Sequence, residues 1–243
     1  MLSLLIQSLK GNIMAKMKNY FLIVCVFMAV AVAVVCLAEP KAENRFEKEI
    51  RVFEKTDSKN TAADNAILFV GSSSIRMWAT QDYFPKLKVI NRGFGGSQIS
   101  DVIHFSHRIV FPYKPKLIVF YAGDNDVAVG KKAQRVFDDY KSFVKLAREQ
   151  LPKTPIIFIA IKPSMSRWKL WPEMKKANAM IEGFCQSDPA LFYFDAATPL
   201  LGTDGKPNND LFMPDLLHLN AQGYKAWTKR LTPVIEKALK EKN

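Results

Sequence analysis

The sequence predicts a three-layer α/β/α domain built on a roughly five-stranded parallel sheet. Two features of the chain favour this class. Short runs of Ile, Leu, Val and Phe alternate with longer stretches of helical periodicity, and polar residues hardly interrupt the short runs. Strands that helices cover on both faces have this composition, and parallel strands are normally covered in that way.

The expected elements follow one another in this alternating order. Phe46, Ile50 and Phe53 recur at helical spacing among charged residues, so an amphipathic helix is expected within 43–55. The expected strands are 66–70, 87–90, 117–121, 156–161 and 191–194. The helices expected between and after them are 98–110, 131–151, 172–187 and 220–240. This order is typical of repeated strand–helix–strand units, whose strands are parallel.

Chemistry-bearing segments come directly after the expected strands. Ligands of such sheets bind beyond the carboxyl ends of the strands. The segments found there are Gly71–Ser74, Asn91–Gly96, Gly123–Asp126, Lys162–Ser164 and Asp195. Asp215 and His218 lie in a polar loop before the last expected helix. We therefore expect one functional site at this edge of the sheet.

Residues 1–38 have the pattern of a secretory signal peptide. They contain three lysines and no acidic residue, and an apolar run over 20–35 is followed by the small residue Ala38. Cleavage after Ala38 would leave one mature domain, residues 39–243, in the periplasm or outside the cell. The alternatives are an uncleaved membrane anchor formed by the same apolar run, or lipidation at Cys36.

The remaining chain is basic and has a single cysteine. Without the three lysines of residues 1–38, 32 Lys and Arg stand against 23 Asp and Glu, a net charge of about +9. The basic residues are scattered and form no nucleic-acid motif, so we expect at most weak contact with membrane surfaces or anionic polymers. Cys185 is alone in the mature domain, and it is expected to be a small buried hydrophobe.

A serine nucleophile would need a base, a group that orients this base, and donors for the developing oxyanion. Of the three histidines, His104 and His107 lie within an expected helix, where solvated or packed side chains are the simpler interpretation. His218 lies three residues after Asp215, so the carboxylate can reach the imidazole. Taken alone, this pair has two equally good interpretations. It is either a catalytic pair, or an aspartate that caps a helix beside a histidine at the surface.

Four segments together resemble the sequence blocks of the SGNH (GDSL-type) hydrolases. They are Phe69-Val70-Gly71-Ser72-Ser73-Ser74, Gly93-Phe94-Gly95-Gly96, Gly123-Asp124-Asn125-Asp126 and Asp215-Leu216-Leu217-His218. Their order is that of the family, and the chain is similar to its platelet-activating-factor acetylhydrolase-like esterases from about Ala66 to Lys237. The resemblance implies the flavodoxin-like SGNH hydrolase fold and a serine esterase or acylhydrolase that uses no cofactor and no metal.

The resemblance also implies the site residues. Ser73 would be the nucleophile, His218 its base, and Asp215 the carboxylate that orients the base. The oxyanion hole would consist of the backbone N–H groups of Ser73 and Gly96 and the side-chain amide of Asn125. Gly96 suits this role because a residue without Cβ lets the backbone approach a ligand closely.

Positions next to these blocks leave questions open. The family usually has aspartate where this chain has Ser72, which puts loop hydrogen bonding in doubt, and Ser74 is a second serine beside Ser73. Trp168 and Trp171 follow the fourth expected strand. There they would stack on a sugar, line an acyl pocket, or simply cover the core.

The implied reaction is hydrolysis of a carboxylic ester through an acyl-enzyme. The expected substrates are short-acyl esters such as O-acetylated saccharides, or lysophospholipid-like esters, and no nucleic acid. No insertion between the blocks is long enough for a lid or a deep apolar tunnel, which favours short acyl groups. The alternative function is a non-catalytic module that binds a cell-envelope glycan, although every expected catalytic element is present.

Overall fold

The computed structural model describes residues 14, 16–18, 20, 43–58 and 65–241. The chain divides into a unit Met1–Arg45 and a unit Phe46–Asn243, and the sheet lies in the second unit. The predicted signal peptide and its cleavage site after Ala38 lie outside the described residues, apart from the positions between 14 and 20 given above. None of the helices that the structure describes is long and apolar enough to span a membrane.

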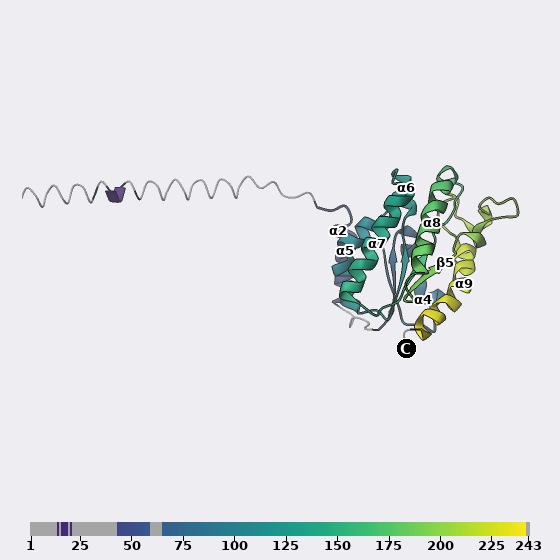
Figure 1. Ribbon diagram of the computed structural model, residues 1–243, viewed down its shortest axis with the longest axis horizontal. Coiled ribbons are helices and arrows are strands. Elements are labelled where there is room, and N and C mark those ends of the chain that lie inside the picture. The colour runs from purple at the N-terminus through teal and green to yellow at the C-terminus, as the bar shows by residue number, and fades with distance from the viewer. Residues whose placement is uncertain (1–13, 15, 19, 21–42, 59–64, 242–243) are drawn as a thin grey trace, which may run out of the picture. The chain divides into compact units, whose positions relative to one another are not determined.

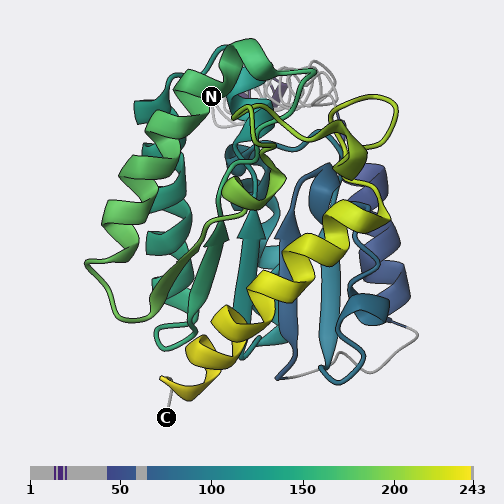
Figure 2. The same ribbon diagram turned by 90° about the vertical axis from the view of Figure 1, so that its right-hand side faces the viewer.

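Within the described chain, five strands form one parallel sheet in the order β2-β1-β3-β4-β5. The strands are β1 (Ile67–Gly71), β2 (Val89–Gly93), β3 (Leu117–Tyr121), β4 (Ile156–Ile159) and β5 (Leu191–Phe194). This is the flavodoxin-like order, in which the winding reverses at β1. The predicted sheet is therefore confirmed. In Figure 2 the strand arrows point toward the loops at the top of the view.

Helices cover both faces of this sheet. They are α2 (Glu47–Asp57), α3 (Ser73–Arg76), α4 (Thr80–Tyr83), α5 (Ile99–Ile109), α6 (Asp124–Ala128), α7 (Ala133–Gln150), α8 (Trp171–Cys185) and α9 (Ala221–Lys240). Helices α2, α5, α7 and α8 lie on one face of the sheet, and α9 and the segment around α4 lie on the other (Figure 1). Their buried side chains form two separate cores with the strands. The predicted three-layer architecture is confirmed.

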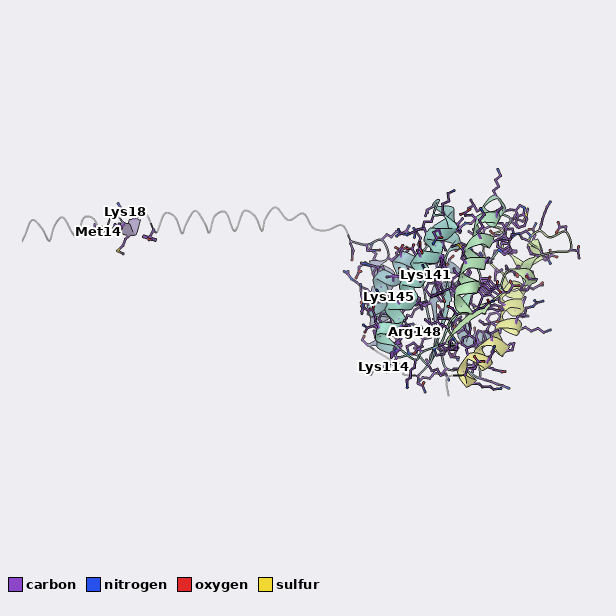
Figure 3. The ribbon with its side chains drawn as sticks, in the orientation of Figure 1. Met14, Lys18, Lys114, Lys141, Lys145 and Arg148 are labelled. Carbon is purple, nitrogen blue, oxygen red and sulfur yellow. The ribbon has the colours of Figure 1, made fainter. Side chains whose placement is uncertain are left out.

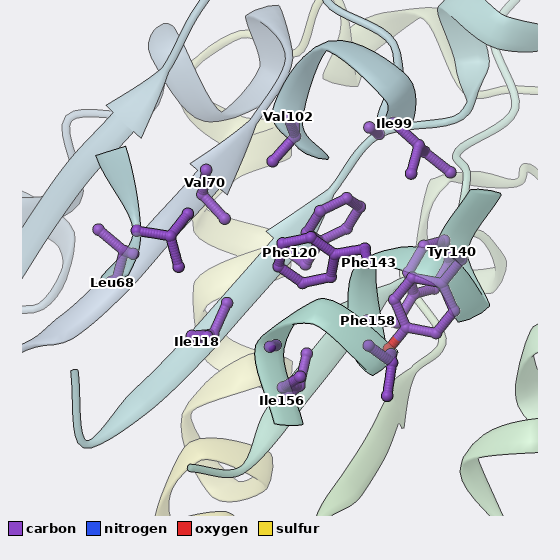
Figure 4. Close-up of a cluster of buried hydrophobic side chains, with 14 of the residues drawn as sticks. Leu68, Val70, Ile99, Val102, Ile118, Phe120, Tyr140, Phe143, Ile156 and Phe158 are labelled. Carbon is purple, nitrogen blue, oxygen red and sulfur yellow. The ribbon is translucent and has the colours of Figure 1, made fainter. Parts of the chain in front are cut away.

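Side chains that alternate between two cores explain why the central strands β1, β3 and β4 are apolar throughout. On β1, Leu68 belongs to the core beneath α5 and α7, whereas its neighbour Phe69 belongs to the core beneath α9. Figure 4 shows the first of these cores, in which the rings of Phe120 on β3 and Phe143 on α7 have centroids 4.5 Å apart. Each residue of these central strands thus has an apolar environment on whichever face its side chain lies.

The structure differs from the sequence-based expectations at the margins of the sheet. β2, expected over 87–90, begins at Val89 and continues through the polar residues Asn91 and Arg92. Because β2 lies at the edge of the sheet, Asn91 and Arg92 are only partly buried, and polar residues are tolerated there. β4 ends at Ile159, two residues earlier than expected. The one-turn helices α3, α4 and α6 were not expected, since one turn is too short to show a helical period.

Two basic side chains of α7 have acidic partners. Figure 3 labels Lys141, Lys145 and Arg148 along this helix. Lys141 pairs with Asp138 at 3.0 Å, and Arg148 pairs with Asp188 at 3.3 Å. Part of the positive charge is therefore compensated locally, and weak contact with a membrane or an anionic polymer stays a prediction.

Candidate active site

The turn after β1 brings the first candidate residue to the edge of the sheet. Gly71 has a φ of +139°, and a Cβ at this position would lie 1.8 Å from the carbonyl oxygen of Tyr121 on β3. Only glycine therefore permits this close passage. The backbone N–H of Ser72 then donates to the same carbonyl at 2.9 Å, and Ser73 begins α3. The neighbouring strand thus fixes the point at which Ser73 leaves the sheet.

Ser73, His218 and Asp215 are joined by consecutive hydrogen bonds. Nε2 of His218 lies 2.9 Å from Oγ of Ser73, and Nδ1 of His218 lies 2.6 Å from Oδ2 of Asp215. The His218 side chain is 21 % exposed, so the ring that bridges the other two residues also borders solvent. The structure therefore brings together all three residues of the expected triad.

A tight turn holds Asp215 against the histidine. Oδ1 of Asp215 accepts the backbone N–H groups of Leu217 and His218, each at 2.9 Å, and Leu216 has a left-handed φ of +53°. Burial, though slight, favours the neutral acid, but the hydrogen bonds from His218 and from the two backbone groups outweigh it and lower the pKa of Asp215 to about 2. The carboxylate is therefore ionised at neutral pH.

The carboxylate of Asp215 does not cap the last helix. The N-cap of α9 is Asn220, whose Oδ1 accepts the backbone N–H groups of Gln222 at 2.9 Å and Gly223 at 3.1 Å. The helix-capping interpretation of Asp215 is therefore wrong. Its carboxylate bonds instead to the imidazole and to its own turn.

The two serines that flank Ser73 are buried. Ser74 is 1 % exposed, and its carbonyl oxygen accepts a 2.9 Å hydrogen bond from the hydroxyl of Tyr224 on α9. Ser72 is the N-cap residue of α3, and its carbonyl oxygen accepts backbone N–H groups from that helical turn. Backbone hydrogen bonds therefore hold the turn at Ser72. Between these two serines, the hydroxyl of Ser73 bonds to the imidazole of His218.

Gly96 and Asn125 come from the turns after β2 and β3. Gly96 has a left-handed φ of +79°, and a Cβ there would meet no atom of the described residues within 4 Å. Backbone conformation, rather than crowding by neighbours, thus accounts for this glycine. Asn125 on α6 donates from Nδ2 to the carbonyl oxygen of Ser97 at 3.0 Å. This bond joins the turn that contains Gly96 to the start of α6.

A buried charged cluster contacts Asn125, and sequence reasoning missed it. Nη2 of Arg167 donates to Oδ1 of Asn125 at 3.0 Å, and Nη1 lies 3.1 Å from Oδ2 of Asp124. Lys162, 1 % exposed, lies 3.5 Å from the same carboxylate oxygen. Burial lowers the pKa of Lys162, although the charge of Asp124 opposes this. The one available signal was that Lys162 follows an expected strand.

A second buried cluster holds the start of α5. Asp126 is fully buried, and its two carboxylate oxygens lie 3.2 and 3.3 Å from the backbone nitrogen of Ile99. Lys131 donates to Asp126 and to Asp139, each at 2.8 Å. Burial raises the pKa of Asp126, while the bond from Lys131 lowers it. These bonds fix α6 relative to the segment that leads from Gly96 into α5.

The remaining residues singled out from the sequence separate into two groups. Trp168 and Trp171 stack with their ring centroids 6.3 Å apart and an interplanar angle of 19°, and both are partly exposed. Trp171 packs against the core. Trp168 is the next residue after Arg167 in the sequence. His104 and His107 are exposed on α5, which confirms that they are solvated helix residues.

Within the described ranges, no three His, Cys, Asp or Glu side chains are arranged to hold a metal ion. The charged side chains near the expected triad pair with one another, as Arg167 and Lys162 do with Asp124. The hydrogen bonds of His218 to Ser73 and Asp215 suit proton transfer and nucleophilic attack by the serine hydroxyl.

The sequence matches the GDSL-like lipase/acylhydrolase family over residues 72–226. No curated protein sequence matches the chain. Solved structures are similar to it in fold. One is a Streptococcus pneumonia protein named for platelet activating factor (TM-score 0.70, 18 % identity, 86 % of this chain and 98 % of that chain). Others are a GDSL-like lipase from Bacteroides thetaiotaomicron (0.69, 20 %, 78 % and 98 %) and a carbohydrate esterase family 3 protein from Talaromyces cellulolyticus (0.59, 19 %, 73 % and 99 %).

The match to the family extends from the turn after β1 into α9, and it includes the segments in which Ser73, Asn125 and His218 lie. It covers more than half of the chain, whereas the similar structures, at their low identities, show the fold. The chain therefore belongs to the GDSL-like lipase/acylhydrolase family and is a serine esterase or acylhydrolase.

Proposed function

We propose that the protein hydrolyses short-acyl carboxylic esters, such as O-acetylated saccharides, through an acyl-enzyme formed on Ser73. The observation that carries the proposal is the pair of hydrogen bonds of His218, 2.9 Å to the hydroxyl of Ser73 and 2.6 Å to the carboxylate of Asp215. A serine hydroxyl becomes an effective nucleophile only when a base takes its proton. The imidazole is close enough to do so, and the carboxylate holds it in place.

The acylation step uses both ring nitrogens of His218. Oγ of Ser73 attacks the ester carbonyl carbon while Nε2 accepts the hydroxyl proton. The ionised carboxylate of Asp215 accepts the hydrogen bond of Nδ1–H and stabilises the imidazolium that forms. The tetrahedral intermediate then collapses, the bond to the alcohol oxygen breaks, and the alcohol leaves with the proton from Nε2.

Deacylation repeats these steps with water as the nucleophile. Nε2 of His218 takes a proton from a water molecule, and the resulting hydroxide attacks the acyl carbon. When this second intermediate collapses, Oγ of Ser73 regains the proton and the carboxylic acid is released. In both steps the oxyanion would be held by the backbone N–H groups of Ser73 and Gly96 and by the amide of Asn125.

Three observations support a small, polar substrate. The segments at 123–130 and 203–210 are rich in Gly, Asp and Asn and offer little apolar surface. The stacked, partly exposed Trp168 and Trp171 offer a surface on which a sugar ring would pack. In addition, a carbohydrate esterase is among the proteins with this fold. A lysophospholipid-like ester is the second candidate, which the acyl-length prediction in the Discussion separates from the first.

A non-catalytic glycan-binding module is the alternative from another class. A pure binding site has no need for a serine that bonds to a histidine, and the 2.9 Å bond therefore counts against it. The membership of a family of acylhydrolases also counts against it.

The decisive experiment compares Ser73→Ala with Ser74→Ala in hydrolysis of p-nitrophenyl acetate and in labelling by a fluorophosphonate. We expect Ser73→Ala to abolish both, and Ser74→Ala, whose side chain is buried, to keep most of both. Labelling that survives in Ser73→Ala would assign the nucleophile to another residue. A wild-type protein that accepts no label would support the binding module.

We also propose that residues 1–38 direct export and are removed after Ala38. The lysines, the apolar run and the small residue at position 38 support this proposal. Mass spectrometry of the protein from its native host is expected to find Glu39 at the mature N-terminus. An intact N-terminus in the membrane fraction would support the uncleaved anchor instead.

A further inference from the structure

Arg167 contacts two neighbouring residues of α6 with the two ends of one guanidinium group. Nη2 donates to Oδ1 of Asn125 at 3.0 Å, and Nη1 faces Oδ2 of Asp124 at 3.1 Å as an ion pair whose angle is not that of a hydrogen bond. The side chain is 19 % exposed, so water competes little for these groups. The guanidinium is therefore held beside the amide that the proposed mechanism uses.

An arginine neighbour determines which way an asparagine amide points. A guanidinium can only donate hydrogen bonds, so the group of Asn125 that faces it must be the carbonyl oxygen. The amide nitrogen then lies on the other side, where it donates one hydrogen to the carbonyl oxygen of Ser97 at 3.0 Å. An amide nitrogen carries two hydrogens. The second one is the donor that the proposed oxyanion hole requires.

The position of Arg167 is itself fixed by charge. Asp124 pairs with Arg167 and also lies 3.5 Å from the buried ammonium of Lys162. Its other carboxylate oxygen accepts the backbone N–H of Asn125 at 3.0 Å. Asp124 thus connects the guanidinium to the main chain of the same residue whose side chain the guanidinium holds. If Arg167 is replaced, Asp124 keeps Lys162 as a partner, and the fold should survive.

We propose that Arg167 is a positioning residue for ester hydrolysis, which holds the amide of Asn125 so that one N–H points to the oxyanion. The inference rests on the proposed function of Asn125. The positive charge also draws electron density toward Oδ1, which makes the amide N–H a stronger donor. Arg167 therefore acts on the transition state through Asn125 and touches no reacting atom.

A double-mutant cycle tests this directly, because two residues that act as one unit give non-additive effects. The four proteins are wild type, Asn125→Ala, Arg167→Met and the double variant, assayed for kcat and KM with p-nitrophenyl acetate. We expect Arg167→Met to lower kcat about tenfold to a hundredfold with little change in KM, the factor typical of a charge-assisted hydrogen bond. The double variant should be within about threefold of Asn125→Ala.

Two further variants separate positioning from charge and from folding. Lys169→Met removes an exposed positive charge two residues away and is expected to keep the wild-type kcat. Arg167→Lys keeps the charge but lacks the planar fork that reaches both Asp124 and Asn125, so we expect a loss of about tenfold or more. If Arg167→Met does not fold, as judged by its melting temperature, Arg167→Lys takes its place in the cycle.

The outcomes distinguish this inference from the proposed function. Multiplicative effects of Asn125→Ala and Arg167→Met in the double variant would overturn the positioning role, as would wild-type activity in Arg167→Lys. In either case Asn125→Ala would remain impaired and Ser73 would remain labelled. Failure of the proposed function would instead leave the wild type without activity and without label.

Discussion

Asp215 and His218 are bonded to each other twice. Oδ2 of Asp215 lies 2.6 Å from Nδ1 of the imidazole, and Oδ1 accepts the backbone N–H of His218 at 2.9 Å. One carboxylate therefore holds both the ring and the main chain of the same residue. Because an ionised carboxylate only accepts, Nδ1 must carry the hydrogen, and Nε2 is left as the acceptor that faces Ser73.

Replacing this carboxylate by an amide should cost most of the activity. Asp215→Asn keeps the shape of the side chain but favours the wrong tautomer of His218, so we expect kcat to fall by roughly 10⁴ with p-nitrophenyl acetate. Asp204→Asn changes an exposed aspartate of the same polar segment and should leave kcat unchanged. An Asp215→Asn variant with more than a tenth of the wild-type kcat would exclude this role for the carboxylate.

The lowered pKa of Asp215 also makes its contribution to stability depend on pH. The folded value of about 2 lies below the unfolded value of ~3.9, so the ionised group stabilises the fold above about pH 4. This contribution is lost as the pH falls toward 2, and it is small because the side chain is 45 % exposed. Urea unfolding of wild type and Asp215→Asn at several pH values should show a free-energy difference that is constant near neutrality and shrinks on acidification. A difference that grows below pH 4 would contradict this.

Asn125 should matter for rate and not for binding. Loss of one side-chain donor from an oxyanion hole typically costs roughly 10²–10³ in kcat. We therefore expect Asn125→Ala to lower kcat by about this factor and to leave KM within about threefold of the wild type. The exposed Asn209 provides the control, since Asn209→Ala removes the same kind of amide from a residue that the proposed oxyanion hole does not use. An effect confined to KM would make Asn125 a substrate-binding residue.

Activity should fall as the acyl chain of the substrate grows. Each additional methylene contributes about 0.8 kcal/mol only when an apolar wall buries it. The short, Gly-, Asp- and Asn-rich segments near the site provide little such wall. In a detergent-free series of p-nitrophenyl esters we expect kcat/KM to be highest for acetyl and to decrease beyond butyryl. Faster hydrolysis of the decanoyl ester would favour a lipid substrate.

Cys185 should be inert in the folded protein. It is 4 % exposed on α8, which confirms the expected buried hydrophobe, and burial raises the pKa of its thiol to about 12. Iodoacetamide should therefore leave native protein lacking residues 1–38 unmodified and active, yet modify it in urea. Cys185→Ala should keep the wild-type kcat. Inactivation of the native protein by the reagent would show that the thiol is accessible.

The buried strands could be predicted because each consists of residues that only a covered sheet accommodates. β3 and β5 begin and end where the apolar runs at 117–121 and 191–194 do. The expected range of β2 was wrong at both ends, and it stopped before Asn91 and Arg92 because these residues are polar. Their place in an edge strand depends on pairing with β1, and the local sequence carries no information about this pairing.

The candidate triad could also be anticipated, since strand ends in a parallel sheet converge and the sequence offers few histidines. Arg167 could not be. It lies 42 positions after Asn125, in a loop whose path no periodicity describes, and its role depends on a contact between side chains. Polar clusters of this kind leave no pattern in the local sequence, because their members can lie at any distance from one another along the chain.

The bond from Tyr224 to the carbonyl oxygen of Ser74 has a consequence for the order of events during synthesis. A residue of α9 holds the turn that presents Ser73, and the imidazole that contacts Ser73 lies 145 positions further along the chain. A growing polypeptide therefore has no activated serine until His218 and α9 have been translated. Chains released before Ala221 should take up no fluorophosphonate, whereas chains that include α9 should acquire reactivity.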